Sequence, residues 1–484
     1  MFCKDCDKFY NVVSIFPNTE PSIKGIDCLD QEAFVMTNST TLNLSYQKTD
    51  YISTDNKASI TASLTGGNGG YKYKLGSGEY QSSNVFSGLN TGSYTLYAKD
   101  RNNNEVSTTV KISKQPIFVA KSVVLYGNTI TYTTTDTFST YSWSVTGGTI
   151  ISGANTKTVQ ISFPTVGNAV VTVNTTDSIG ATGTYSYNVE VTDSILVDAK
   201  AVLQGPVVYN ISYSTFYMHD TLRIKGYVPL EQPYGKSPYN TSFYVNVNNS
   251  GNETTTSSVI GEIGYLPDLV TPKVDSPNSV VDWVYLQLRT KNSGAEIYPV
   301  HSTRSALILR NGKIVDVDGV SPVKFKINST NTLDSKFYLV IKHRNHLGAM
   351  TAFPLGFNLT NEGYYQTEFD FSTDNSTWTN TNSSNSAQIT LQQFHALRAG
   401  NANGDNQIRT QGSNTDTTAL LIKVGVATPN NIVSGYFRED VSMDGKVEYT
   451  GGDKTDLLIV NAAIGDLFGS NSAVVILEQL PPTS

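Results

Sequence analysis

The 484-residue chain has little charge and little cysteine, and it lacks long amphipathic stretches. Charged residues make up only 15% of it, and its 3 cysteines, Cys3, Cys6 and Cys28, all lie near the N-terminus. A structural zinc site needs four ligands, so the Cys-x-x-Cys pair and one further thiol do not complete one. The first histidine, His219, is far away in sequence. We therefore expect free thiols or a single disulfide in an N-terminal segment.

Further absences limit the function. The net charge of -7 and the lack of a basic stripe argue against nucleic-acid binding. No apolar run reaches the roughly 18 residues of a transmembrane helix, so no membrane span is predicted. The segment Met1–Tyr10 has no apolar core and does not read as a secretory signal. A processed secreted protein, export by another route, or a virion protein released by lysis would each explain this.

Known catalytic motifs are also missing. The chain contains no Gly-x-Ser-x-Gly, no His-Glu-x-x-His and no phosphate-binding glycine loop. His343 and His346 would point to opposite faces of one strand, so they are not expected to share an ion. Asp282 is interpreted as a turn or ladder cap, and Asp316 and Asp318 as ordinary hairpin residues. We expect no catalytic residues and no enzymatic activity.

The composition indicates β-structure. Thr, Ser, Asn and Gly dominate, there are 28 tyrosines, and short runs rich in Val, Ile, Thr and Tyr alternate with turn residues. Short helices are expected only near the C-terminus, after two Asx-rich loops.

Residues 56–113 form the first compact module. It carries a Gly-Gly-Asn-Gly-Gly-Tyr71 turn, then Phe86-Ser-Gly-Leu-Asn-Thr-Gly-Ser-Tyr94, and Lys99-Asp100 near its end. This pattern resembles a SprB-type repeat, the short β-sandwich module of Bacteroidota surface adhesins. The resemblance implies a surface role.

A second module spans about 116–191. It centres on Tyr141-Ser-Trp143 followed by two glycines and Val-rich strands. It resembles a PKD-like immunoglobulin-fold domain, which implies that Trp143 fills the core between two sheets.

The region 200–465 resembles a C-terminal region of large Bacteroidota surface proteins. Its landmarks include Val280–Arg289 and Val340–Gly348, and in that family they precede dockerin-like calcium loops. The family has no single activity, so the resemblance implies location and stability more than chemistry.

Two loops near the C-terminus, residues 401–409 and 440–448, place oxygen-bearing side chains at their positions 1, 3 and 5, as Ca²⁺ requires. Gly445 would supply the turn at position 6 of the second loop, and Asn406 would do so at position 6 of the first. Neither loop has an acid at position 12, so a later carboxylate must complete each set, as in Asp416 for the first loop and Asp453 or Asp456 for the second. The alternative is two Asx-rich turns that bind nothing. The candidate ligands are Asn401, Asn403, Asp405, Gln407 and Asp416 in the first loop, and Asp440, Ser442, Asp444, Lys446, Asp453 and Asp456 in the second.

The two loops are not expected to be equal. The first carries fewer negative charges and has Arg409 at position 9, a ligand position, so tighter binding is predicted at the second. The apolar residues Ile408 and Val447 are expected to pair across a pseudo-twofold axis, coupling metal binding to local folding.

These observations predict an all-β fold of tandem immunoglobulin-like β-sandwich domains followed by a small dockerin-like calcium-loop unit with short helices. The expected segments are an N-terminal leader or anchor (1–55), the SprB-type repeat (56–114), the PKD-like domain (115–194), a larger β-rich domain (195–394) and the calcium-loop unit (395–484).

The favoured hypothesis is a non-enzymatic attachment protein on a surface, namely a head or tail fibre or decoration protein of a phage infecting Bacteroidota. Its location would be the virion surface, with Ca²⁺ bound. Expected partners are other virion or cell-surface proteins, contacted through the N-terminal segment, a host glycan, or a second copy of the chain. The alternatives are a bacterial cell-surface adhesin fragment at the cell surface, or the accessory binding region of a polysaccharide-degrading enzyme.

Overall fold

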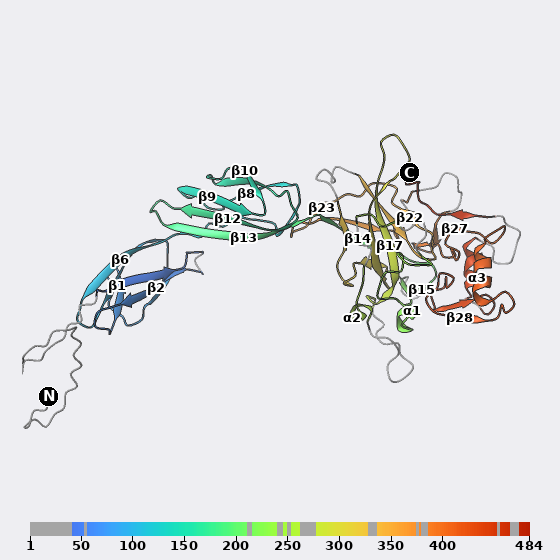
Figure 1. The fold of residues 1–484 in the computed structure, drawn as a ribbon, viewed down its shortest axis with the longest axis horizontal. Coiled ribbons are helices and arrows are strands. Elements are labelled where there is room, and N and C mark those ends of the chain that lie inside the picture. The colour runs from blue at the N-terminus through green and yellow to red at the C-terminus, as the bar shows by residue number, and fades with distance from the viewer. Residues whose placement is uncertain are drawn as a thin grey trace, which may run out of the picture. The chain divides into compact units, whose positions relative to one another are not determined.

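The computed structural model places the chain in two compact units, residues 1–113 and 114–484 (Figure 1). Strands dominate, with four short helices in the described part, so the all-β prediction is confirmed. Residues 1–40 lie outside the described part, and so do the predictions for Cys3, Cys6 and Cys28. The described residues are 41–52, 56–210, 215–239, 245–248, 253–261, 277–327, 336–373, 377–378, 386–452, 455–464 and 474–484.

Residues 41–113 fold into two three-stranded sheets around one apolar core. Alternation in the second strand buries Ala58, Ile60, Ala62 and Leu64 and leaves the intervening residues at the surface. The first strand pairs with it along its whole length, so the predicted leader of 1–55 is too long: residues 43–48 belong to the sandwich. The strands are β1 (Asn43–Lys48), β2 (Ala58–Thr65) and β4 (Val85–Leu89) in one sheet, and β3 (Lys72–Leu75), β5 (Gly92–Lys99) and β6 (Glu105–Ile112) in the other.

A second sandwich opens the 114–484 unit. Trp143 is only 4% exposed, packs against Phe118 at 5.1 Å between ring centroids, and donates its indole N–H to the Thr156 carbonyl. Its predicted place in the core between the sheets is therefore confirmed. The strands are β7 (Val123–Leu125), β13 (Thr182–Thr192), β12 (Gly167–Thr176) and β9 (Thr140–Thr146) in one sheet, and β10 (Thr149–Ser152), β11 (Thr158–Ser162) and β8 (Thr129–Thr133) in the other.

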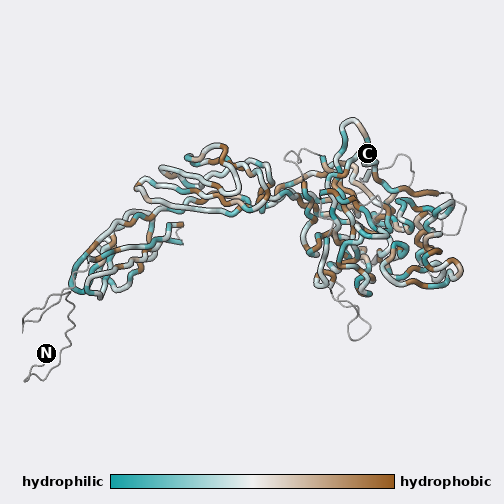
Figure 2. Tube along the Cα trace, viewed as in Figure 1, coloured by the Kyte–Doolittle hydropathy of each residue, from teal (hydrophilic) through white to brown (hydrophobic). Residues whose placement is uncertain are grey.

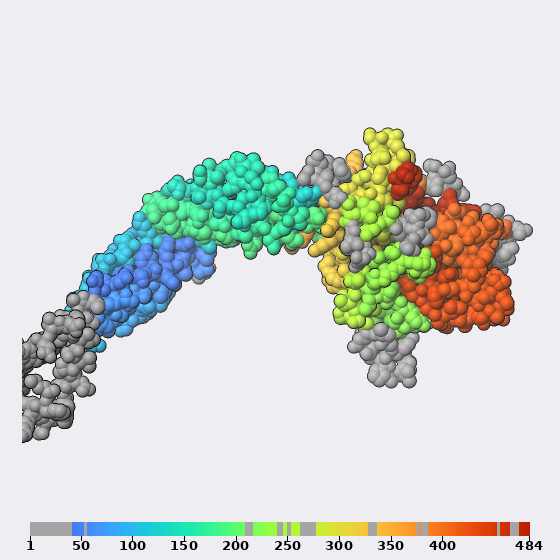
Figure 3. Space-filling model, in the orientation of Figure 1, coloured from blue at the N-terminus to red at the C-terminus, as the bar shows by residue number. Residues whose placement is uncertain are grey.

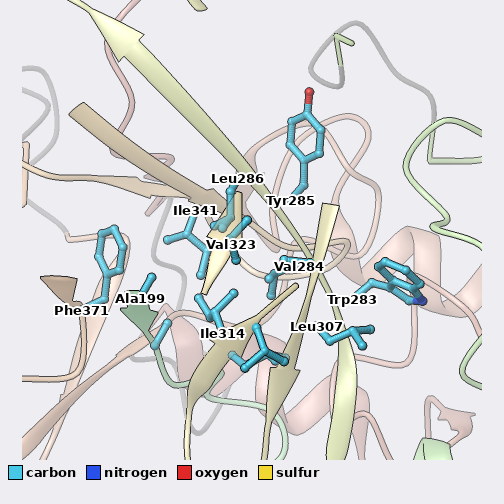
Figure 4. Close-up of a cluster of buried hydrophobic side chains, with 14 of the residues drawn as sticks. Ala199, Trp283, Val284, Tyr285, Leu286, Leu307, Ile314, Val323, Ile341 and Phe371 are labelled. Carbon is cyan, nitrogen blue, oxygen red and sulfur yellow. The ribbon is translucent and has the colours of Figure 1, made fainter. Parts of the chain in front are cut away.

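A nine-stranded sheet forms the centre of the same unit. Figure 4 shows side chains from several of its strands meeting in one apolar cluster, with Trp283 and Leu307 on one side and Phe371 on the other. Each such fully buried side chain contributes about 1.5–3 kcal/mol. Its strands run in the order β22 (Ala349–Met350), β21 (Phe337–Lys342), β17 (Val280–Thr290), β18 (Val300–Leu309), β19 (Lys313–Val315), β14 (Ser194–Lys200), β24 (Tyr365–Asp370) and β23 (Asn358–Leu359), with β20 (Val323–Lys326) also paired to β14.

The second sandwich contacts this sheet through a close backbone approach. Val123 donates its N–H to the Glu362 carbonyl at 2.8 Å. Gly363 has φ +114°, and a Cβ there would lie 1.9 Å from the Val123 carbonyl oxygen, so only glycine fits.

Figure 2 shows hydrophobic and hydrophilic residues intermixed along the strands of this unit.

Smaller elements surround the sheet. They are the hairpins β15 (Val207–Asn210) with β16 (Thr215–Met218) and β25 (Gln388–Leu391) with β26 (Phe394–Leu397), and the single-turn helices α1 (Thr221–Ile224) and α2 (Ser257–Ile260). In the described part, no helix is both long and apolar enough to cross a bilayer.

The C-terminal residues build a separate apolar cluster that includes Ile408 and Val447. These two residues do not pair with each other as predicted: Ile408 pairs with Ile476, and Val447 with Val433. Each loop therefore gains its own partner strand, which single-sequence reasoning could not assign. The elements are β27 (Gln407–Ile408) with β30 (Ile476–Leu477), β28 (Ile432–Ser434) with β29 (Lys446–Glu448), and the helices α3 (Asp416–Val424) and α4 (Asp456–Ala463). Figure 3 shows this orange part lying against the yellow and green surface of residues 200–350.

Candidate cation loops and the buried polar network beneath them

The two predicted loops lead into two helices that begin in the same way. Thr415 precedes α3 and Thr455 precedes α4, and each accepts a hydrogen bond through its side chain from the backbone N–H three residues on. This N-cap fixes where the helix starts. The first helical residue is then an aspartate in both cases, Asp416 and Asp456.

Both aspartates turn back onto the loop that precedes them. Asp416 accepts the N–H of Asn403 at 3.2 Å on one carboxylate oxygen and that of Arg409 at 2.9 Å on the other. Asp456 accepts the N–H of Ser442 at 3.0 Å and that of Glu448 at 2.8 Å in the same way. In each loop these donors are positions 3 and 9. The structure thus brings a late carboxylate to each loop at equivalent places. Asp453, the other candidate for the second loop, lies outside the described residues.

The second loop is closed by its own aspartates. Asp440 accepts the N–H of Asp444 at 3.1 Å and of Gly445 at 2.9 Å, and the Ser442 hydroxyl donates to it at 3.1 Å. Asp444 accepts the N–H of Lys446 at 2.9 Å. Gly445 has φ +80°, as expected for position 6. In the first loop Asn406 takes this conformation with φ +64°, so both turns match the sequence prediction.

Three of these carboxylates are held in surroundings that oppose their charge. Burial, and then the charge of Asp440, raise the pKa of Asp456 to about 8. Burial also raises the pKa of Asp440 to about 7, against the opposing effect of Arg344. In the first loop burial raises the pKa of Asp416 to about 7. A bound cation would favour the ionised form of each.

The first loop has a different electrostatic character. Asp405 accepts the N–H of Gln407 at 3.0 Å, and its other oxygen forms an ion pair with Arg409 at 2.7 Å. Asn403 accepts the N–H of Asp405 and donates to the Asn414 carbonyl. Asn401 is buried, and its side-chain oxygen has no hydrogen-bond partner.

The donor chemistry of the second loop fits a hard cation. Asp440, Ser442, Asp444 and Asp456 offer carboxylate and hydroxyl oxygens, the ligand type that Ca²⁺ takes, and the Lys446 carbonyl could join them. In the described part of the chain no three His, Cys, Asp or Glu side chains already converge on one point as a preformed metal cluster. The carboxylates are instead bonded to backbone N–H groups of their own loop.

The second loop also borders a solvent-open cavity of about 400 Å³. Its lining includes Ser442 and Asp444 of the loop together with Val207, Val208 and Leu458. An ion could therefore reach this loop without unfolding of its surroundings.

A buried polar network that was missed in the sequence lies beneath the loops. Arg344 and Asp282 form an ion pair at 2.9 Å, His343 bonds to the same carboxylate oxygen at 3.2 Å, and Tyr436 donates to the other at 2.6 Å. Although burial opposes ionisation, the charge of Arg344 and the hydrogen bond from His343 lower the pKa of Asp282 to about 2. Asp282 is therefore a charge-pair centre inside β17, and its interpretation as a turn or ladder cap is wrong.

The prediction that His343 and His346 face opposite sides is also wrong. Strand β21 ends at Lys342, so strand alternation does not apply, and the two Nδ1 atoms lie 3.0 Å apart. His346 Nε2 accepts the N–H of Gly205 at 3.1 Å, which leaves the proton of His346 on Nδ1. Burial lowers the pKa of both rings, that of His346 well below its usual value. The pair thus has a structural role, as its buried neighbours suggested.

The network is tied directly to the second loop. Asn345 donates to the Asp440 carbonyl at 2.6 Å, and Lys225 donates to the Asp444 carbonyl at 2.6 Å. Arg344 donates to the Phe437 carbonyl. These hydrogen bonds both fix the conformation of the second loop and attach it to the nine-stranded sheet. A change in one is therefore expected to affect the other.

The chain is similar to several solved structures at low sequence identity. No protein-family model and no curated protein matches the chain. Among solved structures, a C-terminal 282-residue fragment of intimin, in complex with the intimin-binding domain of its translocated receptor, is 12% identical over 42% of this chain and 83% of that one, with a TM-score of 0.21. Fibronectin(III)-like modules of Clostridium thermocellum CbhA are 16% identical over 28% of this chain and 84% of theirs, at 0.15. The SGBP-B protein of the Bacteroides ovatus mixed-linkage glucan utilization locus, bound to a heptasaccharide, is 12% identical over 71% of this chain and 72% of that one, at 0.16. TM-scores this low do not establish a shared overall fold.

Proposed function

We propose that the chain is a non-enzymatic attachment protein displayed on a surface, and specifically a head or tail fibre or decoration protein of a phage infecting Bacteroidota. One observation carries the non-enzymatic part. The cluster that most resembles catalytic machinery, Asp282 with His343 and His346, is at most 1% exposed and is bonded internally. A substrate could not reach these groups without unfolding the site.

The arrangement of modules supports display on a surface. Two β-sandwiches precede the nine-stranded sheet, and their outer faces carry Thr, Ser, Asn and Lys side chains. Such surfaces suit spacing and contact rather than chemistry. Residues 1–40 would then anchor the chain to its assembly, and a host glycan or protein would be bound by the exposed modules.

We further propose that Ca²⁺ binds the C-terminal loops and has a structural role. The ion would neutralise the buried carboxylates of Asp440 and Asp456 and hold the second loop in the conformation that Asn345 and Lys225 contact. Binding that is confined to the folded state stabilises it by mass action.

The location is tested by mass spectrometry of purified virions, which should detect this chain. Its absence from virions, together with a longer reading frame that extends it, would favour the alternative of a bacterial cell-surface adhesin fragment. Hydrolysis of a polysaccharide by the pure protein would contradict the non-enzymatic proposal and favour the enzyme alternative.

The calcium part is tested on the whole chain. Chelation should lower the melting temperature, and Asp444→Ala should remove most of the chelator-sensitive part. Asp318→Ala serves as the matched control, because Asp318 caps an ordinary turn by accepting the N–H groups of Val320 and Ser321. An unchanged melting curve and no bound calcium by elemental analysis would leave two Asx-rich turns.

A further inference from the structure

The two loops share one backbone design but differ in what lies on the position-5 carboxylate. In the first loop the Arg409 guanidinium contacts Asp405 at 2.7 Å. Its Nε also donates to the Asn414 carbonyl at 3.3 Å. The guanidinium therefore bridges the position-5 side chain and the segment that leads into α3. This is the linking role that a bound cation plays in such a loop.

A second guanidinium lies against the same loop. Arg438 donates to the Asn403 carbonyl at 3.1 Å. A Cβ added to Gly404 would meet the Arg438 side chain at 2.2 Å, so the two are in close contact. A divalent cation entering here would meet two positive groups and would have to displace Arg409 from Asp405. Repulsion between the cation and the guanidinium groups of Arg409 and Arg438 opposes binding of the cation in the first loop.

The second loop also has basic groups nearby, because Lys225 donates to the Asp444 carbonyl at 2.6 Å and the charge of Arg344 acts on Asp440, but neither forms an ion pair with its position-5 carboxylate. Its position 9 is Glu448, in place of an arginine. In the described part of the chain no lysine or arginine forms an ion pair with the side chains of Asp440, Asp444 or Asp456. The Lys446 ammonium pairs with Glu448, at 3.8 Å. Among the described residues, the carboxylates of the second loop accept hydrogen bonds from backbone N–H groups and the Ser442 hydroxyl instead of pairing with a basic side chain.

From this difference we infer that Arg409 acts as a built-in cation that closes the first loop, so that the chain takes up one Ca²⁺, in the second loop. The inference rests on the calcium proposal above. The first loop keeps one trait of a cation site, because the buried Asn401 side-chain oxygen has no hydrogen-bond partner. It is thus a latent site, and removal of the guanidinium should open it.

The experiment counts calcium ions bound to the full-length chain by titration calorimetry and by elemental analysis after gel filtration. The wild-type chain should bind one ion. Asp405→Ala should leave this number unchanged, and Asp444→Ala should reduce it to none. Arg409→Asp should raise it to two, whereas Arg409→Lys, which keeps the charge, should stay at one. Arg101→Asp, an exposed site in the 1–113 unit, controls for added negative charge.

The outcomes separate the two proposals. Two ions on the wild-type chain, or one ion that is lost with Asp405→Ala and kept with Asp444→Ala, would overturn the role of Arg409 while leaving calcium binding intact. A single ion on a folded Arg409→Asp chain would also overturn it. No calcium on either the wild-type chain or Arg409→Asp would reject the calcium proposal itself. If Arg409→Asp does not fold, the Asp405 and Asp444 variants still decide which loop holds the ion.

Discussion

Asp282 and Arg344 lie 62 positions apart in sequence, yet their side chains meet at 2.9 Å with neither exposed to solvent. The aspartate belongs to β17, and the arginine follows β21. Because Arg344 also bonds to the Phe437 carbonyl, this pair links the nine-stranded sheet to the segment that carries the second loop.

Removing one partner of this pair should be costly. Asp282→Ala leaves the Arg344 guanidinium buried without its counter-charge, which we expect to lower the free energy of unfolding by about 3–5 kcal/mol. Urea denaturation measures the loss. Glu231→Ala is the control, because its ion pair with Lys236 is exposed, and such pairs contribute only about 0–1 kcal/mol. Equal losses in the two variants would contradict a structural role for the buried pair.

Gly205 should tolerate no side chain. A Cβ at this position would lie 2.0 Å from the Val441 carbonyl oxygen and 3.4 Å from the His346 ring. Gly205→Ala must therefore push the second loop away from the sheet, at a cost of roughly 1–3 kcal/mol or more. Gly356→Ala is the matched control, since a Cβ there meets nothing within 4 Å. Thermal unfolding that is unchanged for both would show that the loop can shift freely.

The buried His346 should make stability depend on pH. Its folded pKa is well below the usual 6.5, so under acid conditions the unfolded chain binds a proton that the folded chain does not. The contribution of the neutral, buried His346 to the free energy of unfolding is therefore fully present above pH 6.5 and is lost as the pH falls below it. At pH 5.5 the loss should be about 1 kcal/mol.

The raised pKa values of Asp416, Asp440 and Asp456 have the opposite sign, because they favour folding as the pH falls through 8 and 7. The test therefore compares how the free energy of unfolding changes with pH in the wild-type chain and in His346→Gln. Both proteins contain the three aspartates, so their effect cancels in the difference. The wild-type chain should lose more stability than the variant between pH 7.5 and 5.5. His395→Gln, in the β25–β26 hairpin, controls for loss of a histidine as such. Parallel pH profiles for all three proteins would contradict the prediction.

Trp143 should dominate the second sandwich. Trp143→Ala removes a buried ring and leaves the Thr156 carbonyl without its donor, so we expect a loss of about 3–5 kcal/mol in that domain. Trp143→Phe should cost less, because it retains the contact with Phe118. Ile151→Ala, at a side chain 58% exposed, should change stability by no more than about 0.5 kcal/mol. Urea unfolding measures each loss. Circular dichroism follows the two Trp143 variants, and tryptophan fluorescence follows Ile151→Ala.

Local pattern was enough to predict much of this molecule. Alternation and turn residues predicted strands, and the resemblance to SprB-type and PKD-like domains implied the sandwiches and the place of Trp143 in a core. The left-handed turn at Asn406 and the return of Asp416 to its loop followed from loop chemistry, since these features depend on residues close in sequence, whereas the sequence left Asp453 and Asp456 as alternatives for the second loop.

What the sequence left open involves distant partners. The contact of Asp282 with Arg344 depends on how strands far apart in the chain pair, which spacing does not reveal. His343 and His346 were assigned to opposite faces because the end of β21 at Lys342 carries no strong stop signal. The partners of Ile408 and Val447 likewise come from strands that are only two or three residues long.

The position of β14 has a mechanical consequence. This strand follows the second sandwich directly, and it lies inside the nine-stranded sheet, with β20 and β19 along one edge and β24 along the other. Tension arriving from the N-terminal side would pull β14 along its own axis, so the hydrogen bonds on both edges would bear the load together in shear. Force applied across the strand would instead break these hydrogen bonds one after another. The junction between the second sandwich and this sheet is therefore loaded in shear whenever the chain is pulled from its N-terminal side.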